Sequence, residues 1–164
     1  MVISLPGKHG RPNRAAVPIS PEGRVTRPAP TPQIELFHPQ TTPKPWGNEV
    51  LIAQGPGYTG KILHRLSGPQ YHRAGLQFHT RKTETFHLYS GLAWVYFIKG
   101  GEVYKILLKP GMSVHVPAGA IHSVATQGIS VMFEAAEYAP DSETINVEAD
   151  YNVADAIEVP PERL

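Results

Sequence analysis

The chain has 164 residues, 41% of them hydrophobic, and its 15 basic and 14 acidic residues give a formal net charge of +1. This is enough for one domain with a buried core, and no apolar run approaches the roughly 18 residues of a membrane span or the length of a signal peptide, so we expect a cytoplasmic protein with no membrane partner. The absence of cysteine excludes disulfides and thiolate metal sites.

Residues 1–45 contain ten of the seventeen prolines, which favours an extended arm over a packed segment. Within residues 1–33, five basic side chains stand against one acidic one. A basic extended segment could contact nucleic acid or an acidic surface, or exchange onto a second copy of the chain. Solvated Pro-rich tails are commoner, so we expect no nucleic-acid partner.

From about residue 50 the sequence changes to short runs of strand-forming composition separated by Gly, Pro, Ser and Gln. This pattern predicts an all-β barrel or sandwich over residues 46–140. The strands are expected at 49–53, 61–66, 76–79, 84–89, 93–99, 103–108, 113–116, 123–125 and 130–138.

Residues 141–164 form an acidic C-terminal tail, which we expect to pack on or near the barrel. Only residues 153–157 have a helical composition. Barrels of this size tend to pair or exchange edge strands, which covers exposed sheet edges, so we expect a homodimer.

Two segments carry four candidate metal ligands. Gln77 and His79 are two residues apart, so on a strand their side chains share a face. The next four residues can reverse the chain, after which Glu84 opens a neighbouring strand, and His122 follows a turn. An amide oxygen, two imidazoles and a carboxylate suit one divalent ion of Mn, Zn, Fe, Ni or Co. A six-coordinate ion would keep two positions open for water or substrate.

These two segments resemble the two motifs of the cupins. The first motif matches at Gln77, His79, Glu84 and Gly91, with glutamine in place of the first histidine, and the second at Gly111, Pro117, Gly119 and His122. The leading glycine of the first motif is here Tyr71, the closing asparagine of the second motif is here Thr126, and neither is a ligand position. The resemblance implies a small jelly-roll barrel with a metal site.

A narrower resemblance, over residues 43–152, is to the type II mannose-6-phosphate isomerase branch of the cupins. It is carried by residues 44–49, 76–79, 90–91 and 148–151. Glutamine is common in the first ligand position of that branch. The resemblance implies aldose-ketose isomerisation of a sugar phosphate through an enediolate.

The isomerisation also needs phosphate contacts and a base. Lys61 and Arg65 are an even number of residues apart on one predicted strand, and they could hold a phosphate if they face inward. Because Glu84 would be a ligand, the base must be another group. His64, His87 and His115 are candidates if they face inward, although a structural role is the commoner one for histidines such as His87 and His115. Lys82, in the turn between ligands, is expected to be exposed.

Two other functions remain open. Mixed histidine and carboxylate ligation also permits dioxygenase chemistry at Fe(II). Alternatively, the barrel could be a non-catalytic module for sugar binding or assembly, because a fold does not determine a function. A basic cavity would favour phosphate substrates and an apolar one dioxygenase chemistry.

Overall fold

The computed structural model describes residues 34–66, 72–137, 143–147 and 150–163. Residues 38–164 form one unit by their internal contacts. Most of the predicted arm, residues 1–33, lies outside the described residues. Its last part does not continue as an arm, because Gln40–Lys44 pairs with the next strand. An edge strand tolerates Pro43, so the proline content did not prevent this strand from forming.

Eleven strands form one sheet in the described part of the chain. Their bounds are β1 Gln40–Lys44, β2 Gly47–Gly55, β3 Tyr58–Arg65, β4 His72–Arg73, β5 Gln77–His79, β6 Glu84–Lys99, β7 Glu102–Leu108, β8 Ser113–Val116, β9 His122–Ala136, β10 Thr144–Asn146 and β11 Ile157–Glu158.

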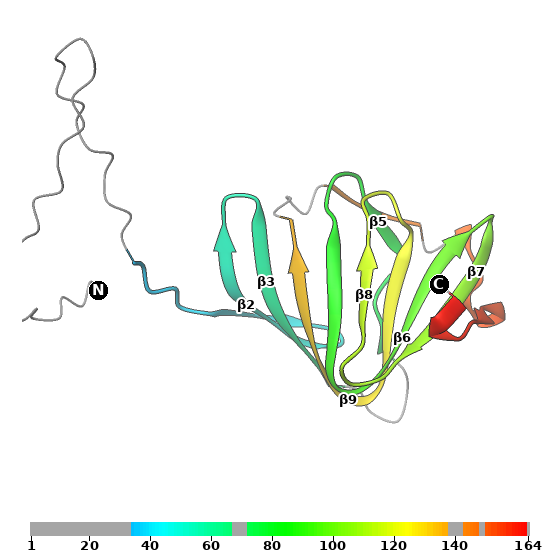
Figure 1. The fold of residues 1–164 in the computed structure, drawn as a ribbon, viewed down its shortest axis with the longest axis horizontal. Coiled ribbons are helices and arrows are strands. Elements are labelled where there is room, and N and C mark those ends of the chain that lie inside the picture. Colours follow the sequence, from blue (N-terminus) through cyan, green and yellow to red (C-terminus); the bar gives the residue numbers. More distant parts are fainter. Residues whose placement is uncertain (1–33, 67–71, 138–142, 148–149, 164) are drawn as a thin grey trace, which may run out of the picture. The chain divides into compact units, whose positions relative to one another are not determined.

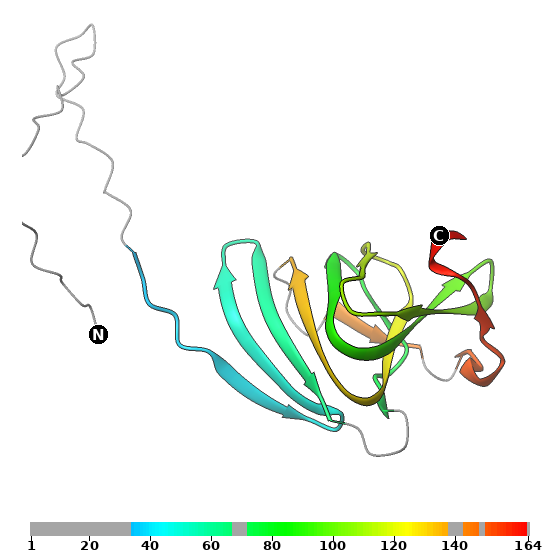
Figure 2. The same cartoon turned by 60° about the horizontal axis from the view of Figure 1, so that its bottom comes forward.

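The long strands β6 and β9 lie side by side and run through both halves of this sheet (Figures 1 and 2). In the first half, the start of β6 pairs with the end of β9 and with β8, and β3, β2 and β1 follow beyond β9. In the second half, the end of β6 pairs with the start of β9 and with β7, while β4 and β5 pair with β9. The two halves are therefore joined by two shared strands.

Both shared strands are irregular where the halves meet. The register between them shifts twice between Leu88 and Leu92. Gly91 has a φ of +87°, and a Cβ at this position would lie 2.5 Å from the Cβ of Ser130, so only glycine fits this close approach. The sequence predicted separate strands before and after this point, and the structure has one bent strand in each case.

Along the start of β6 and the end of β9, buried side chains alternate with more exposed ones, and apolar side chains of the two halves meet in one cluster. Phe86 and Leu88 come from the first half, and Val95 and Ile106 from the second. Burying apolar surface at about 25 cal/mol per Å² is the main force that holds the halves face to face. This arrangement is the small jelly-roll barrel expected from the sequence. The other buried members of the cluster are Leu63, Ala93, Leu108, Val116, Val124 and Met132.

The C-terminal segment adds strands to the sheet. Strand β10 pairs antiparallel with β5, and β11 pairs parallel with β7. The predicted helical residues contain only the short 3-10 helix η3, Val153–Asp155, and a second such helix, η4, spans Pro161–Arg163. No helix in the described residues is long and apolar enough to cross a membrane.

The sequence predicted that Glu84 opens a strand next to the one that carries His79, and this is wrong. Strand β5 pairs with β10 and β9, whereas Glu84 lies in the other half, where β6 pairs with β8 and the end of β9. The link 80–83 therefore crosses from one half of the sheet to the other. Glu84 approaches His79 from the opposite half and not from a neighbouring strand.

Candidate metal centre

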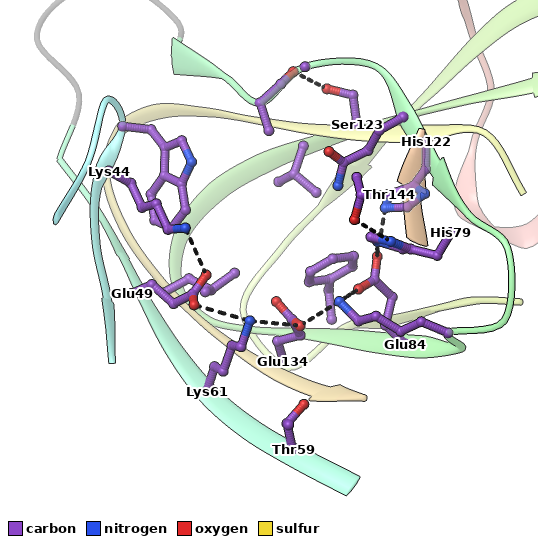
Figure 3. Close-up of a pocket in the computed structure, with 18 of the residues that line it drawn as sticks. Lys44, Glu49, Thr59, Lys61, His79, Glu84, His122, Ser123, Glu134 and Thr144 are labelled. Carbon is purple, nitrogen blue, oxygen red and sulfur yellow. Dashed lines mark hydrogen bonds and ion pairs between the residues drawn. The ribbon is translucent and has the colours of Figure 1, made fainter. Parts of the chain in front are cut away.

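A cavity of about 710 Å³ lies in the interior of the barrel, and the three predicted ionisable ligands line it. His79 comes from the end of β5, Glu84 from the start of β6 and His122 from the start of β9. The turn of the second motif is tied to the first, because the amide of Gly119 donates to the carbonyl of His79 at 2.7 Å. Figure 3 shows the three side chains close together on one side of the cavity.

One potential ligand atom from each of the three residues lies within 4.8 Å of the other two. The Oε1 of Glu84 is 2.6 Å from Nε2 of His122 and 3.4 Å from Nε2 of His79. All three side chains are buried, with Glu84 only 2% exposed. The residues that the sequence placed in two separate motifs therefore converge on one point.

Both imidazoles are held through their Nδ1 atoms. Nδ1 of His122 is 3.0 Å from the carbonyl oxygen of Ala120, and Nδ1 of His79 is 3.0 Å from Oγ1 of Thr144. Because a carbonyl can only accept, Nδ1 of His122 carries a proton, and in the neutral ring Nε2 then presents a lone pair. Each ring thus turns Nε2 toward Glu84.

This arrangement fits a divalent cation. Nε2 of His122 faces a carboxylate oxygen, and the two atoms can lie this close only with a positive charge between them, which is a proton in the metal-free protein and a metal ion when one is bound. Within the described part of the chain, His79 Nε2 and Glu84 Oε1 are buried without a hydrogen-bond partner. Buried polar atoms in this state are uncommon, and they are satisfied by coordination to an ion. His79, Glu84 and His122 therefore form a group that could hold one metal ion.

The charge state of Glu84 is set by its neighbours. Burial by itself would raise the pKa of this carboxyl, but the contacts with His122 and His79 and the nearby charge of Lys82 outweigh burial and hold the pKa well below its usual range. Burial likewise opposes the charge on Lys82, but Glu134 and Glu84 outweigh it and raise the pKa of that ammonium group. A buried carboxylate is thus kept ionised, as a metal ligand must be.

A series of ion pairs runs from Glu84 along the cavity wall (Figure 3). We call this series the ion-pair chain. Charges of opposite sign alternate along it, from the metal group through β9, β3 and β2 to β1. Nζ of Lys82 contacts Glu84 and lies 3.0 Å from Oε1 of Glu134. The members, in spatial order, are Glu84, Lys82, Glu134, Lys61, Glu49 and Lys44.

Gln77, the fourth predicted ligand, lines the same cavity. It is the residue directly opposite His122 in the pairing of β5 with β9. It therefore lies beside the histidine pair, and its role as a ligand stays a prediction.

Lys61 and Arg65, the predicted phosphate contacts, both line the cavity, as their even spacing on one strand indicated. Both are already engaged by other groups. Lys61 belongs to the ion-pair chain, and the guanidinium of Arg65 donates to the carbonyl of Val124 at 3.0 Å and stacks over the ring of Trp46.

The three candidate bases do not line the cavity. His64 alternates with the buried Leu63 and Arg65 and is exposed. His87 hydrogen-bonds to Ser113, and His115 to Thr85, on the outer side of the sheet. Their proposed role required an inward orientation, and the strand alternation directs them outward.

Four residues of the site were missed by sequence reasoning. Lys82, expected to be exposed, has a side chain only 13% exposed, since two carboxylates hold it in the interior. Glu49 and Glu134 were not considered, although Glu134 occupies the same strand face as the buried Met132. That alternation was readable from the sequence. Thr144, which holds His79, comes from the tail, where no motif pointed to it.

The sequence matches no protein-family model and no curated protein. Solved structures resemble the fold. CapF of Staphylococcus aureus, a capsular polysaccharide assembling protein, has a TM-score of 0.57 and 17% identity, over 69% of this chain and 33% of its own. A variant of oxalate decarboxylase from Bacillus subtilis has a TM-score of 0.57 and 14% identity, over 66% and 30%. KdgF from Halomonas sp. has a TM-score of 0.50 and 18% identity, over 65% and 90%. The match thus spans about a third of the first two proteins and most of the third.

Proposed function

We propose that this chain, which has the cupin fold of those structures, binds one divalent metal ion and uses it to act on a small carbohydrate. His79, Glu84 and His122 would hold the ion, with Gln77 as the fourth ligand. The observation that carries the proposal is the convergence of three buried ligand atoms within 4.8 Å of one another on the wall of a cavity. Manganese has a precedent on this fold, because the oxalate decarboxylase of Bacillus subtilis contains Mn(II) centres.

The cavity supports a small polar substrate. Its volume of about 710 Å³ lies within the range of roughly 300–1,000 Å³ typical of ligand pockets. The lining carries charged groups of both signs, which suit hydroxyl-rich molecules better than apolar ones. This lining argues against the dioxygenase alternative, for which we expected an apolar cavity. The name of CapF, a capsular polysaccharide assembling protein, also supports a carbohydrate ligand.

The reaction that we propose is aldose-ketose isomerisation. A bound ion would polarise the sugar carbonyl and the adjacent hydroxyl, which favours loss of the proton on C2. A base takes that proton, the C–H electron pair forms a C1–C2 double bond, and the carbonyl electrons move to oxygen to give an enediolate. Transfer of the hydroxyl proton from O2 to O1 and return of the proton to C1 then give the ketose, with no oxidant or reductant required.

Glu134 is the best-placed base among the described residues. It is buried, lines the cavity and is joined to Glu84 through the single ammonium group of Lys82. Glu49 is farther along the ion-pair chain, beyond Lys61. Contacts with Lys82 and Lys61 orient the Glu134 carboxylate, and catalysis by a general base requires this positioning.

Metal titration and a substrate panel test this proposal. The purified protein, stripped by chelator, should bind one equivalent of Mn, Zn, Fe, Ni or Co and should then interconvert mannose with fructose, or their 6-phosphates. Oxygen uptake under Fe(II) without isomerisation would support the dioxygenase alternative. Binding of sugar without turnover would support the non-catalytic module. No metal uptake at all would end the case for a metal centre.

A further inference from the structure

We propose that the cavity is built for an uncharged sugar and discriminates against a phosphorylated one. This inference rests on the proposed function and names the substrate class of the same site. It departs from the expectation that Lys61 and Arg65 hold a phosphate. Its basis is the way in which the cations that line the cavity are paired.

The lysines of the cavity wall are each matched by carboxylates. Nζ of Lys61 lies 3.1 Å from Oε1 of Glu49 and 3.8 Å from Oε1 of Glu134. Lys44 lies 3.9 Å from Oε2 of Glu49, and Lys82 lies between Glu84 and Glu134. The wall therefore alternates in sign and presents no concentrated positive charge.

The arginines of the wall are engaged as well. Arg65 is 2% exposed, donates to the carbonyl of Val124 and lies 4.4 Å from the centroid of the Trp46 ring. Its burial lowers the pKa of the guanidinium to about 10, which indicates how strongly this charge is desolvated. Arg73 donates from Nη1 to the carbonyl of Ala74 at 3.3 Å. The guanidinium of Arg65, which is stacked on a ring and bonded to backbone, is therefore poorly placed to present its fork to a phosphate.

A phosphate group would bring nearly two negative charges to a wall that already holds the carboxylates of Glu49, Glu134 and Glu84. It would have to take a lysine from a carboxylate and leave that carboxylate buried without its partner, which is costly. A sugar hydroxyl has no such conflict. It donates to a carboxylate and accepts from the neighbouring ammonium, so a row of alternating charges matches a row of hydroxyls.

The test compares D-mannose with D-mannose 6-phosphate on the full chain, with the metal removed by chelator. Metal removal isolates the wall, because a bound ion attracts phosphate by itself. Calorimetry or ligand-observed NMR should show that the wild-type protein binds mannose at least about threefold more tightly than mannose 6-phosphate. Glu49→Gln frees Lys44 and leaves Lys61 with only Glu134, so it should raise the ratio of mannose 6-phosphate affinity to mannose affinity about tenfold.

Glu137→Gln is the matched control. Glu137 also lines the cavity, but its carboxylate accepts from the backbone amide of Thr83. The substitution Glu137→Gln removes the same charge as Glu49→Gln without releasing a lysine of the ion-pair chain. The control should therefore gain much less phosphate affinity than Glu49→Gln.

Three results would overturn the inference. One is a wild-type protein that binds mannose 6-phosphate as tightly as mannose or more tightly. Another is Glu49→Gln with no gain over Glu137→Gln. The third is absence of mannose binding both without and with metal. Failure of the metal centre is seen separately, as lack of metal uptake by the wild type.

Discussion

The hydroxyl oxygen of Thr144 lies 3.0 Å from Nδ1 of His79, and the two residues are directly opposite each other in the pairing of β10 with β5. The neighbouring Glu143 reinforces this link, because its backbone carbonyl accepts from the amide of Thr80 and its carboxylate contacts Arg81. The tail thus holds the ligand strand and the start of the link to Glu84.

Thr144→Val should weaken metal binding by about tenfold, because loss of the partner of a ligating histidine typically costs 10- to 100-fold in affinity. The valine keeps the shape of the side chain and removes only the hydroxyl. Thr144→Ser, which restores the hydroxyl, should return the affinity to within about twofold of wild type. Isothermal titration with Mn or Zn measures both. Equal affinity in the valine variant would show that the contact does not orient His79.

Replacing His79, Glu84 or His122 by alanine should abolish stoichiometric metal binding. His87→Ala is the matched control, because His87 lies on the outer side of β6 and bonds to Ser113. Metal content of the purified variants, measured by mass spectrometry of the elements, gives the result. Gln77→Ala should lower the affinity less than the other three, since a neutral amide is a weaker ligand than an imidazole or a carboxylate. Full metal content in all four variants would refute the site.

The metal-free protein should become less stable as the pH is lowered, because of Glu84. Its contacts hold the pKa of this carboxyl in the folded state below the ordinary value of 4.5, so the stabilisation is complete above about pH 4.5 and is lost as pH falls below it. The loss reaches at most about 1.4 kcal/mol per pH unit. Urea unfolding between about pH 6 and pH 3 should show the free energies of wild type and Glu84→Gln converging toward low pH. Parallel curves would contradict this assignment.

Glu134→Gln should reduce isomerisation by about 100-fold or more, because a positioned general base typically contributes a factor of 10² to 10⁴. Metal affinity should change little, because Glu134 reaches the metal group only through Lys82. Exchange of the C2 proton of the sugar with deuterated solvent, followed by NMR, reports the step directly. A variant that retains wild-type exchange would exclude Glu134 as the base.

Gly91→Ala should destabilise the fold by more than about 2 kcal/mol, since it combines a left-handed φ with a collision at Ser130 and the carbonyl of Ile129. Gly101→Ala is the control. It has nearly the same φ, +85°, but a Cβ there meets open space, so it should cost only about 1–2 kcal/mol. Denaturant midpoints give the difference. Equal costs would show that the strands can separate at Gly91 without penalty.

The barrel and the three ionisable ligands were predictable because they depend on local patterns. The two-residue spacing of Gln77 and His79 places both along the cavity. The spacing of Glu84 from His79, and of His122 from the preceding glycine and proline residues, completes the two motifs. The bends were not predictable as such. Gly91 reads as a turn in the sequence, and only the continued pairing of β6 with β9 makes it a bend within one strand.

The ion-pair chain was beyond sequence reasoning, because it depends on register between distant strands. Lys61 and Glu134 are 73 positions apart in the sequence, and they lie opposite each other only because β3 pairs with β9 in this register. Whether His64, His87 and His115 point inward depends on which alternate positions of their strands are buried. This is settled once the buried neighbours of each histidine are known.

Strands at opposite ends of the described chain contribute to one site: β1 supplies Lys44, the last cation of the ion-pair chain, and β10 supplies Thr144, the partner of His79. A recombinant fragment trimmed to residues 46–140, the limits expected for the barrel, would carry all four proposed ligands and neither of these supports. Such a fragment would bind metal poorly and would report a different ligand preference from the parent. Expression boundaries for biochemistry and crystallisation should therefore start upstream of residue 40 and continue past residue 147.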